Sequence, residues 1–456
     1  MDPTIFKAYD IRGVYPDQLD EQDAWKIGYA TARFLRSMTS GCGKAGANYQ
    51  SVCVGRDMRT HGEKLSAALI EGINAANVNA IDISLIDSPQ MYFAVNYLGT
   101  CGGIQVTASH NPAEYNGFKI SGLKAVPIGA DTGLKDIAHI AIAMLHTKGK
   151  MDGSVERYDL GAEYKKHVLK FLHPDIKKMK VAIDASNGMA GKVVPLVFGD
   201  APVEIIGTNM EYSGTFKHAP NPLLEENLQD VKRLVREKNC DFGICFDGDA
   251  DRLVMVDEKA EVVGCDLLTA ILTAYFLSAE PGSTIVYDLR SSQVVSEEII
   301  KHGGTPRRER VGHAYMKKTL RDTHGIFGGE LSGHFYYRDN FYADSGLITL
   351  AHVLNITGSS DKPVSELVRP LRRYYSSGEL NFRVRDKAEK MQQLAKKYSD
   401  GNIDYLDGVT VRFKDFWFNC RPSNTEPLLR LNVEAKSQKL LEDKLAEIEK
   451  QLGTRV

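Results

Sequence analysis

The segment from Asp247 to Arg252 reads Asp-Gly-Asp-Ala-Asp-Arg and places three carboxylates at alternate positions. Such charges repel one another unless a cation lies among them, and hard oxygen ligands suit Mg²⁺ or Ca²⁺. The three aspartates and Glu258 also fit ligand positions of an EF-hand loop, but Arg252 stands where that loop requires glycine. The preceding Phe242 to Phe246 has the pattern of a strand, and a solvated acidic turn is a further alternative. We favour a magnesium site that takes additional oxygens from a phosphate.

A serine in a second segment could act as a nucleophile. Thr107-Ala-Ser-His-Asn-Pro112 places Ser109 beside His110, and Asn116-Gly-Phe-Lys119 follows closely. Because Ser, Asn and Pro are common in turns, an ordinary turn is the alternative. No Gly-x-Ser-x-Gly surrounds Ser109, which argues against the nucleophile elbow of a hydrolase. We expect Ser109 to lie on an exposed loop, where its hydroxyl contributes little packing energy.

Three further segments carry groups suited to a sugar phosphate. Glu330 and Ser332, within Gly328-Gly-Glu-Leu-Ser-Gly-His334, could bind adjacent sugar hydroxyls, and Gly312-His-Ala-Tyr-Met-Lys317 opens a predicted helix. The segment from Arg421 to Thr425 combines a guanidinium group, two hydroxyls and an amide. Arginine can hold a phosphate with two parallel hydrogen bonds. Taken alone, the segment 328–334 is better explained as a Gly-rich turn, whereas a capped surface helix at 312–317 and a turn at 421–427 are as good as the functional interpretations.

The composition is that of a globular protein and excludes several classes. The chain has 456 residues, 43% of them apolar and 25% charged, with a formal net charge of −2. The length predicts two to four domains, and the charge does not favour nucleic acid or an anionic membrane as partner. We see no run long and apolar enough for a membrane span and no secretory signal at Met1-Asp2-Pro3-Thr4. The seven cysteines form no Cys-x-x-Cys pair, which predicts reduced thiols and a cytoplasmic protein.

Strand-like and helical patterns alternate along most of the chain, which predicts an α/β protein with mixed, mostly parallel sheets. This alternation of strands and helices begins again twice along the chain, so we predict three similar α/β domains at 1–150, 151–255 and 256–370. The pattern changes near the end, which predicts an α+β domain with an antiparallel sheet at 371–456. The expected strands are 52–55, 80–85, 103–107, 180–184, 242–246, 284–287, 380–384, 409–413, 417–419 and 428–434. The expected helices are 24–38, 63–76, 224–238, 387–398 and one from about 440. A polar, Gly-rich surface loop is expected at 39–50.

In an open α/β sheet, ligands bind beyond the carboxyl ends of the strands. The segments with unusual chemistry follow predicted strands, one in each domain. Together with Lys7-Ala-Tyr-Asp-Ile-Arg-Gly13 near the start, they resemble the α-D-phosphohexomutase family. The motifs occur in family order and extend over almost the whole chain. Leu331, within Gly-Glu-Leu-Ser-Gly, is more similar to the phosphomannomutase/phosphoglucomutase subgroup than to phosphoglucosamine mutases.

The resemblance implies an α/β fold with its domains arranged around one central cleft. It also implies interconversion of hexose 1-phosphate and hexose 6-phosphate, of mannose and/or glucose, through a phosphoserine and a hexose 1,6-bisphosphate, which would also act as activator. The implied Mg²⁺ ligands are Asp247, Asp249, Asp251 and phosphorylated Ser109. The implied catalytic residues are Ser109, His110, Lys119 and Arg12, with Lys119 as the first choice for proton transfer. The implied substrate-binding residues are Tyr9, Arg252, Arg290, Gly312, His313, Glu330, Ser332, His334, Arg421, Ser423, Asn424 and Thr425.

Three alternatives remain at this point. One is a phosphoglucosamine mutase, another a phosphatase with a phosphoserine intermediate, and the third a sugar-phosphate sensor without catalysis. The expected partners are hexose phosphates, with no nucleic acid and no membrane. We expect a monomer or a weak homodimer.

Overall fold

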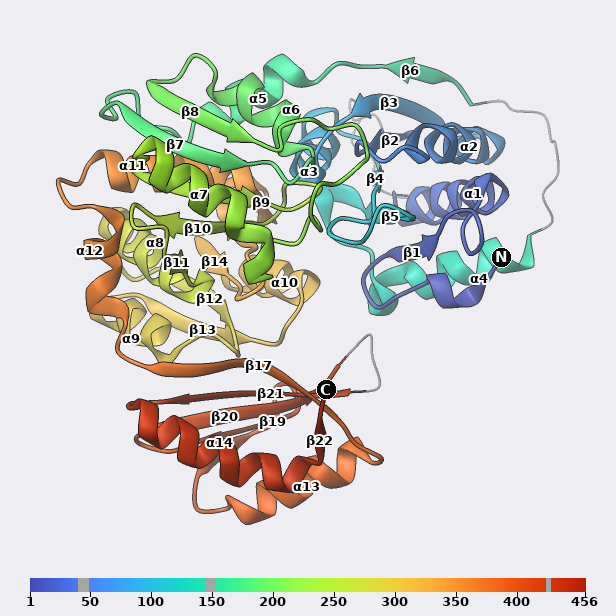
Figure 1. Ribbon diagram of the computed structural model, residues 1–456. Coiled ribbons are helices and arrows are strands. Elements are labelled where there is room, and N and C mark those ends of the chain that lie inside the picture. Colours follow the sequence, from blue (N-terminus) through green and yellow to red (C-terminus); the bar gives the residue numbers. More distant parts are fainter. Residues whose placement is uncertain (40–48, 145–152, 424–427) are drawn as a thin grey trace. The chain divides into compact units, whose positions relative to one another are not determined.

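The computed structural model describes residues 1–39, 49–144, 153–423 and 428–456 (Figure 1). These residues form two compact units. Met1–Val263 and Ser332–Ser365 make up the first unit, and Gly264–Leu331 and Glu366–Val456 make up the second. The predicted loop at 39–50 lies almost wholly outside the described residues. Among the helices of the described part, none is long and apolar enough to cross a membrane.

The first unit begins with a six-stranded mixed sheet in the order β1-β5-β4-β2-β3-β6. Strands β4, β2, β3 and β6 are parallel, whereas β1 and β5 run antiparallel to their neighbours. The elements are β1 (Ile11–Val14), α1 (Glu21–Thr39), β2 (Ser51–Arg56), α2 (Gly62–Ala75), β3 (Asn79–Leu85), α3 (Ser88–Tyr97), β4 (Gly102–Val106), β5 (Tyr115–Ser121), α4 (Lys135–Ala143) and β6 (Val155–Arg157).

Helices cover both faces of this sheet. A β-carbon added to Gly102 would meet Leu35 of α1 at 2.8 Å, whereas one added to Gly103 would meet Met91 of α3 at 2.3 Å. Because successive strand residues point to opposite faces, α1 and α3 must lie on opposite sides. Every residue of β4 is buried, as expected for a strand covered on both faces.

A second sheet of the first unit has the order β11-β10-β9-β7-β8, with β9, β7 and β8 parallel and the other pairs antiparallel. Its elements are α5 (Gly161–Leu169), β7 (Met179–Asp184), α6 (Ala190–Phe198), β8 (Val203–Thr208), α7 (Gln229–Lys238), β9 (Phe242–Phe246), β10 (Leu253–Asp257) and β11 (Val262–Val263). The same unit contains the antiparallel pair β15 (Phe335–Tyr337) and β16 (Ala343–Asp344), and the buried helix α11 (Gly346–Gly358).

The second unit holds a parallel group of strands and a separate antiparallel sheet. The first group consists of α8 (Cys265–Ala279), β12 (Thr284–Asp288), α9 (Gln293–Lys301), β13 (Thr305–Glu309), α10 (His313–Thr323) and β14 (Phe327–Gly329). Strand β12 pairs in parallel with both β13 and β14. The short helix α12 (Val364–Val368) contains the boundary between the units.

The C-terminal sheet has the order β18-β19-β20-β21-β17-β22, and all its pairs are antiparallel. It is built from β17 (Tyr375–Arg383), α13 (Lys387–Lys397), β18 (Asn402–Asp404), β19 (Val409–Arg412), β20 (Phe416–Pro422), β21 (Leu428–Ala435), α14 (Gln438–Leu452) and β22 (Thr454–Arg455). One apolar cluster, including Phe382, Phe418 and Leu431, forms its core. The predicted fold class, three α/β parts and a C-terminal α+β part, is confirmed.

One local expectation needs correction. The predicted helix at 224–238 begins as a 3₁₀ turn at Glu225–Leu228 and becomes α-helical only from Gln229. Lys119, in the segment that follows the Ser109 loop, lies within β5. The six cysteines of the described residues are buried and free of disulfides, which agrees with the expected reduced thiols.

Candidate functional site

The three aspartates lie in the turn of the hairpin formed by β9 and β10. Asp247 N–H donates to the carbonyl of Arg252 at 3.4 Å, and Ala250, at the tip, has a left-handed φ of 57°. A strand–turn–strand is not the helix–loop–helix of an EF-hand. Glu258, which the EF-hand alternative needs as a ligand, instead accepts hydrogen bonds from the backbone and side chain of Ser365. The EF-hand alternative is therefore wrong.

Ser109 lies in the turn after β4 and is fully buried. The expectation of an exposed loop serine is wrong, because the hairpin of the three aspartates packs against this turn. A β-carbon at Gly248 would meet the carbonyl oxygen of Ser109 at 2.5 Å, so only glycine permits this approach. Ser109 itself has a left-handed φ of 51°, a conformation that costs a serine about 1 kcal/mol or more.

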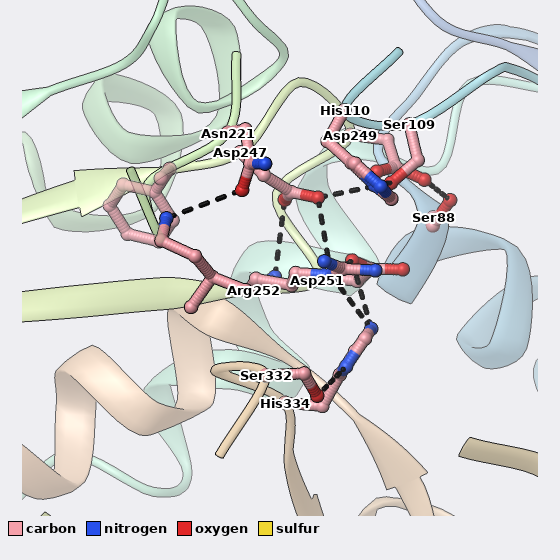
Figure 2. Close-up of polar contacts among 12 residues, drawn as sticks. Ser88, Ser109, His110, Asn221, Asp247, Asp249, Asp251, Arg252, Ser332 and His334 are labelled. Atoms are coloured by element: carbon pink, nitrogen blue, oxygen red, sulfur yellow. Dashed lines mark hydrogen bonds and ion pairs between the residues drawn. The ribbon is translucent and has the colours of Figure 1, made fainter. Parts of the chain in front are cut away.

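The Ser109 hydroxyl contacts both a carboxylate and an imidazole. Its Oγ donates to Asp247 Oδ2 at 3.0 Å and lies 3.2 Å from His110 Nδ1 (Figure 2). Burial, followed by the charges of Arg252 and Arg12, lowers the pKa of His110 well below its ordinary value. The imidazole is therefore neutral near pH 7 and can exchange a proton with the hydroxyl.

Lys119 reaches from β5 into the group of aspartates. Its Nζ lies 2.6 Å from Asp249 Oδ2 and 2.5 Å from Asp251 Oδ2. Burial alone would lower the pKa of Lys119, but the two carboxylates outweigh burial and raise that pKa. Burial raises the pKa of Asp247 well above its ordinary value, and the charges of Asp251 and Asp249 add to this effect. The positive charges of Arg252 and Lys119 oppose this rise in the pKa of Asp247 without cancelling it.

The three aspartates fit a hard divalent cation. One carboxylate oxygen from each lies within 4.8 Å of the others, and all three residues are buried. Asp249 Oδ1 and Asp251 Oδ1 are buried and accept no hydrogen bond of good geometry from the described residues. Buried carboxylate oxygens without donors are costly unless a cation binds them. The donor set is the one that Mg²⁺ prefers.

Further predicted residues of the first unit gather around the same hairpin (Figure 2). Arg252 Nε lies 3.8 Å from Asp247 Oδ2, and His334 Nε2 lies 3.4 Å from Asp251 Oδ1. Ser332 Oγ is 3.0 Å from His334 Nδ1, so the serine sets the orientation of the ring.

Arg12 approaches the Ser109 turn from β1. Its guanidinium pairs with Asp10 at 2.7 Å and donates to the side chain of Asn111 and to the carbonyl of Ala108. Tyr9 lies in the bend before β1. The structure therefore brings together the predicted catalytic and metal-binding residues of this unit.

Sequence reasoning missed the residues that fix the Ser109 turn. Arg59, only 3% exposed, donates to the carbonyls of Ser109 and Asn111 at 2.9 and 2.7 Å, and also to those of Pro112 and Tyr115. Thr107 Oγ1 donates to Asp57 Oδ2 at 2.6 Å and accepts from Ser109 N–H at 2.8 Å. The available signal was Arg56-Asp-Met-Arg59 directly after a strand, at the sheet edge where ligands bind.

Ser88 was also missed. It is the first residue of α3, whose N-terminus is capped by Asp87. Its N–H donates to the carbonyl of Asp249 at 3.0 Å, and its hydroxyl donates to Asp249 Oδ2. Ser88 and Lys119 both donate to Oδ2 of Asp249. They therefore fix the orientation of this carboxylate and leave its Oδ1 without a hydrogen-bond donor among the described residues. No local sequence pattern indicates this contact, since 161 residues separate the partners.

In the second unit, a group of predicted residues lies at the ends of β12 and β14. Arg290 Nη2 pairs with Asp288 Oδ2 at 2.8 Å, and the same oxygen accepts from Leu331 N–H at 2.7 Å. Glu330 Oε1 accepts from Gly312 N–H at 3.0 Å. Gly312, with a φ of 131°, starts α10 in a conformation that favours glycine, and His313 follows as the first helical residue.

Arg421 lies at the end of β20, beside a carboxylate that sequence reasoning missed. Glu379 Oε2 lies 2.5 Å from Arg421 Nη2 and 3.5 Å from Arg290 Nη1, and its Oε1 lies 3.0 Å from Arg430 Nη1. Arg421 is 2% exposed, and its Nε has no hydrogen-bond acceptor among the described residues. Ser423 lies two residues after Arg421, while Asn424 and Thr425 lie outside the described residues.

The chain matches four domain families described for phosphoglucomutase/phosphomannomutase. The α/β/α domains I, II and III match residues 3–144, 162–261 and 265–374. The C-terminal domain matches residues 379–451.

Full-length relatives and a solved structure agree with these matches. A "Phosphomannomutase" of Vibrio cholerae is 38% identical, over 98% of both chains, and one of Escherichia coli K12 is 37% identical, over 95% of both. The crystal structure of a "Phosphoglucomutase/phosphomannomutase family protein" from Burkholderia thailandensis superposes with a TM-score of 0.87 at 32% identity, covering 98% of this chain and 97% of the other. The chain thus belongs to the phosphoglucomutase/phosphomannomutase family and is a hexose-phosphate mutase.

Proposed function

We propose that the enzyme interconverts hexose 1-phosphate and hexose 6-phosphate by way of a phosphoryl group on Ser109. The observation that carries this proposal is the hydrogen bond of 3.0 Å from Ser109 Oγ to Asp247 Oδ2. It places a hydroxyl nucleophile against a set of carboxylates suited to a cation. Phosphoryl transfer depends mainly on alignment and charge stabilisation, which this arrangement provides.

Asp247, Asp249 and Asp251 would hold Mg²⁺, with a phosphate oxygen on Ser109 as a further ligand. When bound, the ion withdraws charge from the transferring phosphoryl group. Lys119 and Ser88 fix the Asp249 carboxylate, and Arg59 fixes the backbone of the Ser109 turn. The protein thus holds the nucleophile and the carboxylates rigidly before substrate arrives.

Each turnover comprises two transfers in opposite directions. A sugar hydroxyl attacks the phosphorus of phosphoserine 109, the bond from phosphorus to Oγ breaks, and hexose 1,6-bisphosphate and free Ser109 result. The intermediate then turns end for end, and Ser109 Oγ attacks the phosphorus of its other phosphate. The bond from that phosphorus to the sugar oxygen breaks, which restores phosphoserine 109 and releases the hexose monophosphate.

The protons lost by the sugar hydroxyl and gained by Oγ must pass through nearby groups. His110 is neutral and 3.2 Å from Oγ, which suits it to accept or return the serine proton. Lys119, held charged by two aspartates, is suited to donate a proton rather than to accept one.

The second unit would bind the phosphate that does not react. Arg421 supplies a guanidinium group and Ser423 follows it; Asn424 and Thr425 would add donors. Of the other residues that we propose bind substrate, Arg290, Gly312, His313 and Glu330 belong to the second unit, and Tyr9, Arg252, Ser332 and His334 belong to the first. Glu330 and Ser332 would hold the hydroxyls at C3 and C4.

We infer that mannose and glucose phosphates are both substrates. The two sugars differ only at C2, whereas the proposed contacts are to O3, O4 and the phosphates. A hydroxyl that changes orientation at a wet position is weakly discriminated. The names of the relatives from Vibrio cholerae and Escherichia coli support mannose, and the Leu331 variant argues against glucosamine as the main sugar.

The test is one preparation assayed with mannose 1-phosphate, glucose 1-phosphate and glucosamine 1-phosphate, with and without hexose 1,6-bisphosphate. We expect kcat/KM for the first two sugars within about a hundredfold, below about 3 kcal/mol. Glucosamine 1-phosphate should be poorer, and bisphosphate should activate enzyme that lacks its serine phosphate. Release of free phosphate without isomerisation would instead identify a phosphatase, and binding without turnover a sensor.

A further inference from the structure

A cavity of about 740 Å³ lies in the first unit, lined by residues that the mutase mechanism does not use. Its walls come from the end of β3, from Arg157 and the residues that follow it at the end of β6, and from the first turns of α5 and α6. Strands β3 and β6 are parallel, so the cavity lies beyond two adjacent carboxyl ends. That edge of an α/β sheet is where ligands bind.

The cavity is separate from the Ser109 turn. The order β4-β2-β3-β6 places β3 two strands, and β6 three strands, from the strand that carries Ser109. With neighbouring strands about 4.8 Å apart, this corresponds to roughly 10–14 Å. A ligand in the cavity would therefore neighbour the catalytic cluster without entering it.

The lining combines an apolar wall with basic side chains. Ile83, Ile86, Leu160 and Leu196 provide the apolar part, and Ile83, Ile86 and Leu160 are buried. Such a mixture of apolar surface and a few polar groups is typical of small-molecule sites, and the volume is in their usual range.

Lys192, on α6, is a basic group of the lining that forms no ion pair within 4.0 Å among the described residues. Its Nζ donates to the carbonyl of Leu85 at 2.5 Å. Burial lowers the pKa of Lys192, and the charges of Asp159 and Asp87 offset this effect only in part, so the ammonium charge is costly where it stands. An anion in the cavity would relieve that cost.

The other charged groups of the lining already have partners. Lys165 pairs with Asp200 at 2.6 Å and Arg157 lies 3.8 Å from Asp82. Asp159 Oδ1 accepts from the N–H of Gly161 at 2.9 Å, at the start of α5. Arg157 and Asp200 are largely exposed, so both ion pairs can rearrange around an anion.

We propose that this cavity binds a small phosphate monoester with an apolar or aromatic body, anchored by Lys192. The phosphate pairs with the Lys192 ammonium, with Lys165 and Arg157 as outer cations. The body of the ligand packs against Leu196, which is only partly buried.

The anchor is connected to the candidate metal-binding hairpin. Lys192 binds the carbonyl of Leu85, and three residues later Ser88 binds both the backbone and the carboxylate of Asp249. A phosphate that draws Lys192 away from Leu85 removes a donor from the segment that orients Asp249. Occupancy of the cavity therefore changes the affinity for Mg²⁺, a consequence that rests on the metal role proposed above, and by linkage Mg²⁺ changes the affinity of the cavity.

The test is calorimetric titration of the full-length protein with phenyl phosphate. Lys192→Met should weaken binding about tenfold or more, because a charge-assisted hydrogen bond is lost. The matched control is Lys177→Met, which removes another lysine that donates to a backbone carbonyl, that of Ser360. Benzyl alcohol, which lacks the charge, and inorganic phosphate, which lacks the ring, should both bind more weakly than phenyl phosphate.

Equal affinity in Lys192→Met and the unchanged protein would overturn the site, as would crystals soaked in phenyl phosphate that show it only elsewhere. The link is tested by titrating Mg²⁺ with and without phenyl phosphate. A changed Mg²⁺ affinity that disappears in Lys192→Met supports it, and an unchanged affinity at saturating phenyl phosphate overturns it. Failure of the mutase assay would leave the phenyl phosphate titration fully interpretable.

Discussion

The two compact units contain charge clusters of opposite sign built in the same way. In the first unit, Asp247, Asp249 and Asp251 form an acidic cluster in which Lys119 pairs with Asp249 and Asp251. In the second, three guanidinium groups, of Arg290, Arg421 and Arg430, surround the Glu379 carboxylate. Each cluster has one further counter-charge, Arg252 beside the aspartates and Asp288 beside Arg290.

The difference in sign indicates the ligand of each cluster. Buried carboxylate oxygens without donors suit a cation, and a buried guanidinium N–H without an acceptor suits an anion such as phosphate. Lys119 and Glu379 keep the clusters stable in the protein alone. A mutase that holds a metal-bound phosphoryl group and a second phosphate needs one cluster of each kind.

The largest effect is expected for Ser109→Ala, which leaves both clusters in place and removes only the hydroxyl. We expect mutase activity to fall by about three orders of magnitude or more. Because Ser109 is buried, some loss of stability should accompany it. The control is Ser437→Ala, which removes the N-cap of α14 and costs about 1 kcal/mol of stability without affecting turnover. Near-normal turnover of Ser109→Ala would refute the phosphoserine mechanism.

Asp249→Asn weakens the acidic cluster specifically. We expect at least about a hundredfold loss of Mg²⁺ affinity, measured by calorimetry, and reversible loss of activity of the unchanged enzyme in excess chelator. Asp415→Asn is the control, because Asp415 pairs with Lys436 instead. Activity that persists in excess chelator would contradict the metal assignment.

Arg421→Ala weakens the basic cluster. Loss of one charged hydrogen bond to phosphate, about 1.5–3 kcal/mol, should lower kcat/KM about 10- to 150-fold, mainly through KM. The control is Arg308→Ala, which breaks an arginine–carboxylate pair with Asp404 in the same unit. Unchanged kinetic constants for Arg421→Ala would show that Arg421 does not bind the substrate phosphate.

Glu379→Gln should have the smallest effect and concerns stability. Burial opposes ionisation of Glu379, but the three arginines outweigh it and lower its pKa. The carboxylate therefore stabilises the fold above its unfolded pKa of about 4.3, and this contribution is lost as pH falls through the lower folded pKa.

At pH 7 we expect the variant to melt about 2–4 °C lower, with the difference disappearing in acid. The measurement is the denaturation midpoint of both proteins between pH 7 and pH 3. A difference that instead grows as pH falls would contradict the proposed role of the arginines.

The strands and the chemistry-bearing turns were predictable because their signals are local. The buried run Phe242–Phe246 followed by alternating aspartates marks a strand and a turn within a few residues, and the structure has both. The same holds for the strand ending at Val106 before the Ser109 turn.

Features that depend on distant residues were not predictable. The burial of Ser109 depends on Gly248, and the orientation of Asp249 depends on Ser88. Glu379 lies in a strand whose sequence gives no reason to expect three arginines around it. The segment 328–334 was read as one loop, yet Leu331 and Ser332 belong to different compact units. Such contacts form when segments far apart in the sequence pack together, and the spacing of residues within one segment does not indicate them.

The central claim is that Ser109 carries the phosphoryl group between substrates. The most direct measurement is mass spectrometry of the protein after incubation with hexose 1,6-bisphosphate, and again after addition of excess hexose monophosphate. We predict one added phosphate on the peptide containing Ser109, its loss on addition of the monophosphate, and neither change in Ser109→Ala. Full turnover without phosphate on Ser109, or phosphate on another residue that turns over, would contradict the account.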